Sequence, residues 1–175
     1  MGKIISQSEL ILQRGEWKRN GKRVVFASGA FDLLHPGHIR LLEQARSQGD
    51  ILVIGIPSDA SVQAAFAAME SAATKNARGA IGIERPITTA SERAEILAAL
   101  GAVDYVTEFE ESSPQALLLA LAPDVQVKGG KRSKDSVAQR EDAAAEAAGI
   151  RCVYVPLEPG YSTTSILERI QQLHA

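Results

Sequence analysis

The chain has 175 residues, 45% hydrophobic and 23% charged, which is enough to bury one good core and predicts a single soluble domain over residues 1–175. Its 19 basic and 21 acidic residues give a formal net charge of -2, which excludes the basic face that DNA or RNA binding needs, so no nucleic acid is expected as a partner. Because the sequence has neither an apolar run long enough to span a bilayer nor a signal-peptide layout, we expect a cytoplasmic protein with no membrane partner.

Strand and helix patterns alternate along the chain. Residues 3–20 predict a leading helix packed outside a sheet, with Leu10, Ile11, Leu12 and Trp17 as its apolar residues. Strands are predicted over residues 23–27, 51–56, 104–106, 124–127 and 151–155. Helices are predicted over residues 37–48, 90–100, 114–121, 135–148 and 163–173. This order predicts an α/β fold with a doubly wound, Rossmann-like parallel sheet, helices on both faces, and ligands at the carboxyl ends of the strands.

The first predicted strand leads into two histidines at the start of a helix. His35 and His38 flank Gly37, so both imidazole rings can face an anion held by the N–H groups of the helix N-terminus. Gly37 allows the backbone to come close to such a ligand. The alternative is that one histidine caps the helix and the other packs against the sheet. We interpret the pair as a candidate phosphate site.

Three later loops also carry candidate chemistry. Asp59 follows the second predicted strand and either caps the next helix, which its residue type favours, or faces a substrate. Residues 128–134 combine glycines with four cations, and a solvated basic loop and a phosphate clamp both remain open there. The hydroxyls of residues 162–164 precede the last helix and can cap it, hold a phosphate, or do both.

Residues 63–84 form the least regular part of the sequence. They are rich in alanine, carry Lys75 and Arg78, and predict a helix followed by a mobile loop, so we treat them as an insertion. The chain has no G-x-x-x-x-G-K-[ST] phosphate loop and no G-x-G-x-x-G fingerprint. The usual kinase, GTPase and NAD-binding interpretations therefore lack their key sequence.

With these residues in view, the run His35-Pro36-Gly37-His38 resembles the H-x-G-H signature of a nucleotidyltransferase superfamily. Within it, the chain is most similar to the adenylyltransferase domain of the bifunctional ADP-heptose synthases. The likeness covers nearly the whole chain, which would then be a single nucleotidyltransferase domain. Its further matches lie in the leading helix and at residues 31–35, 58–62, 85–86, 92–106, 123–124, 127–130 and 162–164.

The resemblance implies transfer of AMP from ATP to a sugar 1-phosphate of the heptose type, with release of pyrophosphate. Mg²⁺ would be bound mainly through the nucleotide phosphates, without a metal site built from protein residues. His35 and His38 would contact the triphosphate and stabilise the transition state. The backbone of Gly29, Ala30 and Phe31 would lie along the phosphates, and Asp32 would anchor the turn or contact bound substrate.

The resemblance also assigns the later loops. Ser162, Thr163 and Thr164 would close on the nucleotide, while Lys128 and Gly129 would add charge and a close backbone approach. The candidate contacts for the acceptor are Asp59, Arg85, Lys131 and Arg132. We hypothesise that the cations of residues 131–134 cover the triphosphate in a closed state.

Two departures from the heptose pattern accompany the likeness. The relatives carry a short basic Lys-Gly stretch where this chain has residues 63–84, and Lys75 or Arg78 is the candidate replacement for its lysine. Lys131 and Arg132 stand where an aspartate and an aromatic residue usually follow the Lys-Gly-Gly element.

Two alternative functions follow. The first is a cytidylyltransferase acting on glycerol phosphate or another polyol phosphate. That branch has an arginine where this chain has Leu157, which favours the heptose-like branch. The second is a catalytically weak, nucleotide-binding regulatory protein. We also expect a homodimer, and the resemblance implies a separate sugar kinase that supplies the phosphorylated acceptor.

Overall fold

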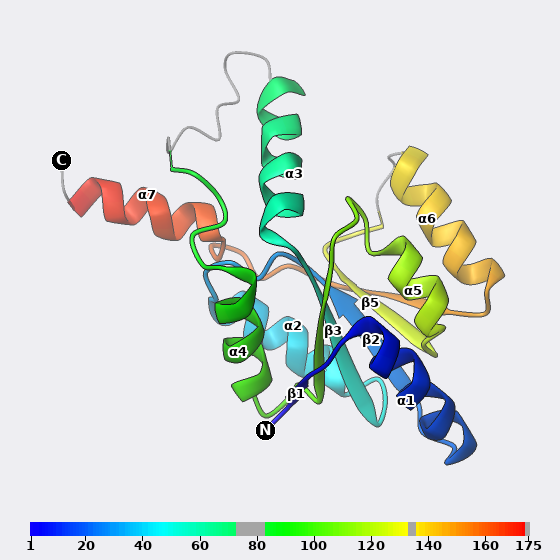
Figure 1. Ribbon diagram of the computed structural model, residues 1–175. Coiled ribbons are helices and arrows are strands. Elements are labelled where there is room, and N and C mark those ends of the chain that lie inside the picture. Colours follow the sequence, from blue (N-terminus) through cyan, green and yellow to red (C-terminus); the bar gives the residue numbers. More distant parts are fainter. Residues whose placement is uncertain (73–82, 133–135, 174–175) are drawn as a thin grey trace.

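A six-stranded, all-parallel sheet forms the centre of the molecule in the computed structural model, which describes residues 1–72, 83–132 and 136–173 (Figure 1). The strand order is β1-β4-β3-β2-β5-β6. The strands are β1 (Lys3–Ile4), β2 (Val24–Ser28), β3 (Ile51–Pro57), β4 (Tyr105–Phe109), β5 (Val125–Gly129) and β6 (Arg151–Val155). The helices are α1 (Gln7–Arg19), α2 (Pro36–Arg46), α3 (Asp59–Ala72), α4 (Ala90–Ala99), α5 (Gln115–Leu121), α6 (Ser136–Ala147) and α7 (Thr163–Leu173).

The sheet has a separate apolar core on each face. On one face, Val25 and Ala27 of β2 pack with α2 and α4. On the other face, Val24 and Phe26 pack with α1, α5 and α6. Because successive strand residues point to opposite faces, the uninterrupted apolar run of β2 fills both cores. The predicted doubly wound fold is thereby confirmed (Figure 1).

The strand order reverses at β2. From β2 the chain adds β3 and then β4 on one side, and afterwards it returns to place β5 on the other side of β2. Ala27 accordingly pairs with Ile54 of β3 and with Val127 of β5. Ligands of doubly wound sheets bind at such a reversal, outside the carboxyl ends of the strands. The loop that leaves β2 is therefore the one best placed to hold a ligand.

The predicted leading helix is wrong at its start. Residues 3–4 form the edge strand β1, because the N–H of Lys3 donates to the Asp104 carbonyl and the N–H of Ile5 donates to the Val106 carbonyl. The helix begins only after Ser6, whose side chain forms a capping box with Glu9. Its buried residues are Leu10 and Trp17, whereas the side chain of Leu12, also expected to pack, is 76% exposed.

The remaining predicted strands and helices are present, with ends that differ by at most three residues. In the region interpreted as an insertion, α3 confirms a helix as far as Ala72. Residues 73–82, including Lys75 and Arg78, lie outside the described residues. None of the helices in the described part of the chain is long and apolar enough to cross a membrane.

Candidate functional site

The loop between β2 and α2 turns sharply at Phe31. This residue adopts a left-handed backbone conformation, with φ at 48°, and its ring is buried. Such a conformation is uncommon for a residue with a side chain and persists only where the surroundings hold it. The next residue, Asp32, provides that hold.

Asp32 is 3% exposed and anchors the loop to the segment before α4. Its carboxylate accepts hydrogen bonds from Arg85 Nε at 2.5 Å, from the Ile87 N–H at 2.8 Å and from the Thr88 N–H at 2.9 Å. The Thr88 hydroxyl also donates to the Asp32 carbonyl at 2.8 Å. Burial raises the pKa of Asp32, but these hydrogen bonds outweigh it and the net shift is downward. Of the two roles expected for Asp32, the geometry matches the anchor.

Arg93 forms a second buried anchor beside the first. Its side chain is fully buried, and its guanidinium donates to the Ala30 carbonyl and the Pro57 carbonyl, both at 2.9 Å. It also donates to the Asp59 carboxylate at 2.8 Å. Arg93 thus connects the loop after β2 to the end of β3 and the start of α3.

Three predicted site residues, Asp59, Arg85 and Gly29, lie beside the two anchors with protein contacts of their own. The capping role expected of Asp59 falls to Ser58, whose hydroxyl accepts from the Ser61 N–H at 3.2 Å. Arg85, besides binding Asp32, lies over the Phe66 ring at 4.8 Å from its centroid. The N–H of Gly29 donates to the Gly55 carbonyl of β3 at 3.3 Å, and its expected place along the phosphates stays a prediction.

The two histidine rings stack against each other at the start of α2, with centroids 3.7 Å apart and planes 17° from parallel. His35 is the N-cap residue, and its Nδ1 accepts from the His38 N–H at 3.3 Å. The alternative that one histidine caps the helix is therefore correct for His35. Capping uses only Nδ1, so a neutral His35 carries its proton on Nε2, where it can donate to a ligand.

His38 is held neutral by its surroundings. Burial, and next the neighbouring His35, lower its pKa to about 4. The edge of the ring meets Phe31 at a centroid distance of 5.3 Å. Burial also lowers the pKa of His35. Within the described part of the chain, His38 Nδ1 is buried without a hydrogen-bond partner, which is unusual for a polar atom and typical of functional sites.

The start of α7 meets the same loop. The Thr163 hydroxyl donates to the Leu33 carbonyl at 3.4 Å, and the Ser162 and Ser165 side chains cap the helix by accepting from each other's N–H groups. A Cβ added at Gly37 would lie 3.1 Å from the His35 ring and 3.4 Å from the Tyr161 Cβ. The structure therefore brings the hydroxyl segment to the histidines as expected, with Thr164 exposed at its edge.

The cations at the end of β5 and just after it are paired with carboxylates of α6. Lys128 Nζ is 2.7 Å from the carboxylate of Asp142, which is completely buried on α6 and also accepts from the Tyr154 hydroxyl. Burial raises the pKa of Asp142, but the bonds from Lys128 and Tyr154 bring it below its usual value. Arg132 pairs with Asp142 at 3.4 Å and with Glu146 at 2.7 Å. The charges of Lys128 and Arg132 are thus engaged within the β5–α6 unit.

The remaining residues of this loop are less constrained. Gly129 ends β5, and a Cβ added there would lie 3.0 Å from the Leu157 side chain. The side chain of Lys131 is exposed. The residues at 133–135 lie outside the described part of the chain, so the proposed cover of the triphosphate by residues 131–134 stays a prediction.

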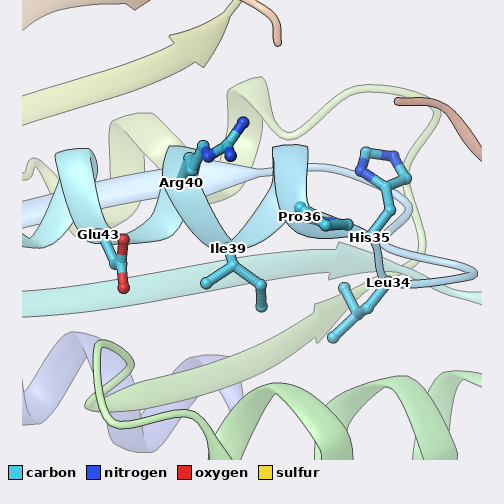
Figure 2. Close-up of a pocket in the computed structure, with 6 residues that line it drawn as sticks. All are labelled: Leu34, His35, Pro36, Ile39, Arg40 and Glu43. Carbon is cyan, nitrogen blue, oxygen red and sulfur yellow. The ribbon is translucent and has the colours of Figure 1, made fainter. Parts of the chain in front are cut away.

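Two hollows adjoin the loop after β2. The larger has a volume of about 460 Å³ and follows one side of α2 from His35 to Glu43. Figure 2 shows the His35 and Arg40 side chains extending to one side of α2 and those of Leu34, Ile39 and Glu43 to the other. The smaller cavity, of about 200 Å³, lies against Gly29 and Ala30 and is lined on its other sides by residues of α3 and of the end of β4. The loop therefore separates two spaces at the carboxyl ends of the strands.

Arg93 and Asp142 are the residues that the site analysis of the sequence overlooked. Both charges lie on the buried faces of their helices, since Arg93 is three residues from Ala90 and Asp142 is three residues from Ala145. A charged residue on an apolar helical face requires a buried partner. A charged residue on an apolar helical face could therefore have been recognised in the sequence, but its partner could not.

Known proteins resemble this chain in both sequence and fold. A family profile described as Cytidylyltransferase-like matches residues 26–169. The chain is 42% identical over 171 residues to the Bifunctional protein HldE of Rhodopseudomonas palustris (strain HaA2), which covers 97% of this chain and 31% of that protein. It is 45% identical over 153 residues to the protein of the same name from Geobacter sulfurreducens (strain ATCC 51573 / DSM 12127 / PCA), covering 87% and 28%. The chain thus spans about a third of the length of these curated relatives.

Solved structures share the fold at lower sequence identity. The lipopolysaccharide core biosynthesis protein from Thermoplasma volcanium GSS1 has a TM-score of 0.55 and 24% identity, covering 79% of this chain and 98% of that one. Pantoate-beta-alanine ligase from Francisella tularensis has a TM-score of 0.59 and 14% identity, covering 98% and 80%. The family profile extends from β2 into α7 and includes the histidine pair and the Ser-Thr-Thr turn. The chain therefore belongs to the cytidylyltransferase-like family.

Proposed function

We propose that this chain transfers the adenylyl group of ATP to a sugar 1-phosphate of the heptose type and releases pyrophosphate. The observation that carries the proposal is the stacked, neutral pair of His35 and His38 at the N-terminus of α2. Helix N-termini bind phosphate through free N–H groups and the helix dipole. The choice of adenylyl transfer and of a heptose-type acceptor rests on the likeness to ADP-heptose synthases and on the relatives named HldE.

The proposed reaction is an in-line displacement at the α-phosphorus. An oxygen of the acceptor phosphate forms the new P–O bond, while the bond between the α-phosphorus and the bridging oxygen breaks and its electrons leave with pyrophosphate. The protein supplies no nucleophile. Its task is to orient two anions and to stabilise the charge that develops on the phosphates. His35 has Nε2 free of the capping bond and can donate to a phosphate oxygen from there.

Phosphate binding should change the charge of the histidine pair. An anion beside an imidazole favours its protonated form and so raises its pKa. The pair is neutral in the free protein because burial lowers both pKa values. Binding of a triphosphate therefore favours proton uptake by the pair, which places positive charge where pyrophosphate leaves.

Mg²⁺ belongs to the proposal as an ion held mainly by the phosphates. Asp32, the carboxylate of the loop, is already occupied by Arg85 and by two backbone N–H groups. Among the described residues, no group of three or more His, Cys, Asp or Glu side chains is arranged to hold a metal ion. Bound to the phosphates, Mg²⁺ would neutralise part of their charge.

We assign the acceptor to the cavity of about 200 Å³ beside Gly29 and Ala30. Gly29 and Ala30 line this cavity, and His35 follows five residues after Ala30 on the same loop, which is our reason for assigning the acceptor to it. Arg85 and Asp59, both expected as acceptor contacts, instead hold the cavity's surroundings in place through Asp32 and Arg93. We therefore propose that they shape the acceptor site and do not themselves bind the sugar.

Pyrophosphate release with Mg²⁺ tests the function. ATP, CTP, GTP and UTP are each paired with heptose 1-phosphate, other sugar 1-phosphates and glycerol 3-phosphate. We expect release with ATP and heptose 1-phosphate, and a loss of turnover by orders of magnitude in His38→Ala with an unchanged circular dichroism spectrum. Loss of one transition-state contact commonly costs about 2.7–4 kcal/mol.

The other outcomes each contradict the proposal in a defined way. Release with CTP and a polyol phosphate would assign the chain to the cytidylyltransferase alternative. Nucleotide binding without release would indicate the regulatory alternative. A fully active His38→Ala enzyme would remove the histidine pair from the mechanism. The homodimer, the separate sugar kinase and the cytoplasmic location stay predictions that size-exclusion chromatography, coupled assays and fractionation can check.

A further inference from the structure

Tyr161 extends the histidine stack beyond the two residues of the family signature. Its ring lies 6.4 Å from the His35 ring, centroid to centroid, with the planes 24° apart. Aromatic pairs at this separation attract each other in an offset stack. The rings of His38, His35 and Tyr161 therefore follow one another in a column, which the edge contact to Phe31 closes at its buried end.

The outer end of this column is fixed by a charged pair. The Arg40 guanidinium lies 5.6 Å from the Tyr161 ring centroid and 2.5 Å from the carboxylate of Glu158. Arg40 belongs to α2, whereas Glu158 and Tyr161 belong to the segment before α7. The pair thus ties that segment to the helix that carries both histidines. A guanidinium over an aromatic face is attracted by the negative charge density of the ring.

Gly37 allows the tyrosine to approach. A Cβ at position 37 would lie 3.1 Å from the His35 ring and 3.4 Å from the Tyr161 Cβ, so a side chain there would press against both neighbours. The glycine of the signature therefore admits the tyrosine as well as a ligand.

We propose that Tyr161, backed by Arg40, is a positioning residue that holds the ring of His35 in the orientation needed for phosphate binding. The proposal rests on the proposed function, since it concerns the same reaction. His35 has three contacts that restrict its ring: the capping bond at Nδ1, the stack on His38 at 3.7 Å, and the ring of Tyr161 at 6.4 Å. Its Nε2 is then directed to one place before the nucleotide arrives, which is the preorganisation that electrostatic catalysis requires.

The same contacts affect the protonation of His35. The charged or titratable groups around it are His38 and Arg40 from α2, and Tyr161 and Glu158 from the segment before α7. Burial is the main cause of its lowered pKa. Removal of the Tyr161 ring admits water to His35, so its pKa should return toward the ordinary value.

The test compares Tyr161→Ala with Tyr161→Phe in the full chain. In Tyr161→Ala we expect kcat to fall by roughly ten-fold with little change in the KM of the acceptor, and the His35 pKa, followed by NMR of the imidazole signals, to rise. Tyr161→Phe keeps the ring and should restore both properties. Tyr105→Ala is the control, because Tyr105 is the first residue of β4 and packs on Trp17, away from the carboxyl ends of the strands. It should lower stability without changing the His35 titration.

The two readouts separate this proposal from the proposed function. If no acceptor in the panel is turned over, the His35 titration in Tyr161→Ala still tests the packing. An unchanged kcat together with an unchanged His35 pKa in Tyr161→Ala would overturn the positioning role. A Tyr161→Phe enzyme as impaired as Tyr161→Ala would also overturn it, because the hydroxyl and not the ring would then be the active feature.

Discussion

The two ends of the loop between β2 and α2 are built in opposite ways. At the β2 end, Asp32 and Arg93 are buried, and their polar atoms are occupied by carbonyls, backbone N–H groups or ionic partners. At the α2 end, the stacked histidines are neutral, and His38 Nδ1 has no partner within the described residues. Satisfied buried networks fix a backbone, whereas unsatisfied polar groups remain available for a ligand. The difference separates the support of the site from its chemistry.

The largest expected effect is a loss of folding stability when Arg93, at the β2 end of the loop, is replaced. Arg93→Met keeps much of the volume but leaves the Asp59 carboxylate and the carbonyls of Ala30 and Pro57 without their donor. The Asp59 carboxylate is 38% exposed and can be solvated by water. A part-buried acceptor left without its donor costs about 1–3 kcal/mol, and two carbonyls lose theirs here, so we expect a loss of about 3–4 kcal/mol. Urea denaturation should show a loss of that size. Arg151→Met, which removes an exposed arginine bonded to Gln48, should change stability by less than about 0.5 kcal/mol. Equal losses in the two variants would contradict the anchor.

A smaller loss of folding stability is expected when the charge of Asp32 is removed. Asp32→Asn replaces an acceptor of several N–H groups by an amide with its own donors, and we expect a loss of about 2–3 kcal/mol. Arg85→Gln removes the ionic partner of Asp32 instead. The stability lost in the double variant should be smaller than the sum of the losses in the two single variants by about 1 kcal/mol or more. Glu146→Gln, in an exposed pair with Arg132, should cost less than about 1 kcal/mol. Strict additivity of the two single variants would show that they do not act as one anchor.

The lowered pKa of His38 should make the stability of the fold depend on pH. The pKa of His38 lies at about 4 in the folded protein and near 6.5 in the unfolded chain, so the unfolded state binds more protons between these values. Stability should therefore decline as the pH falls from about 6.5 to 4. With a discount for solvent screening, the decline is on the order of 1–2 kcal/mol. In His38→Gln this part of the stability curve should be flatter, as urea titrations at several pH values would reveal. A curve that matched the unsubstituted protein would assign the acid sensitivity to other groups.

Local patterns in the sequence were sufficient for most of the fold. The apolar runs of the strands and the periodic helices placed every core element except β1. Lys3 and Ile4 form a strand only because they meet β4, about a hundred residues further along the chain. A two-residue edge strand has no periodicity of its own, so the sequence pattern merged it with the helix that follows.

The candidate site was predictable in part for the same reason. His35 and His38 lie within one turn of one helix, and their adjacency follows from local geometry. The partners of Asp32, Asp59 and Lys128 lie 53, 34 and 14 residues away along the chain. Such pairings depend on how the loops meet across the sheet, which residue types alone do not specify. Tyr161 was likewise visible in the sequence, but its stacking on His35 depends on where α7 begins.

The central position of β2 has a consequence for how the molecule opens. Its backbone is hydrogen-bonded to β3 on one side and to β5 on the other, and four of its five residues are buried. Amide protons in such a strand exchange with solvent only when the whole domain unfolds, whereas those of edge strands and projecting helices exchange through local opening. The loop between β2 and α2 is attached to this most protected strand. The backbone of this loop should therefore keep its shape through fluctuations that fray β1, and it should lose that shape only when the entire sheet comes apart.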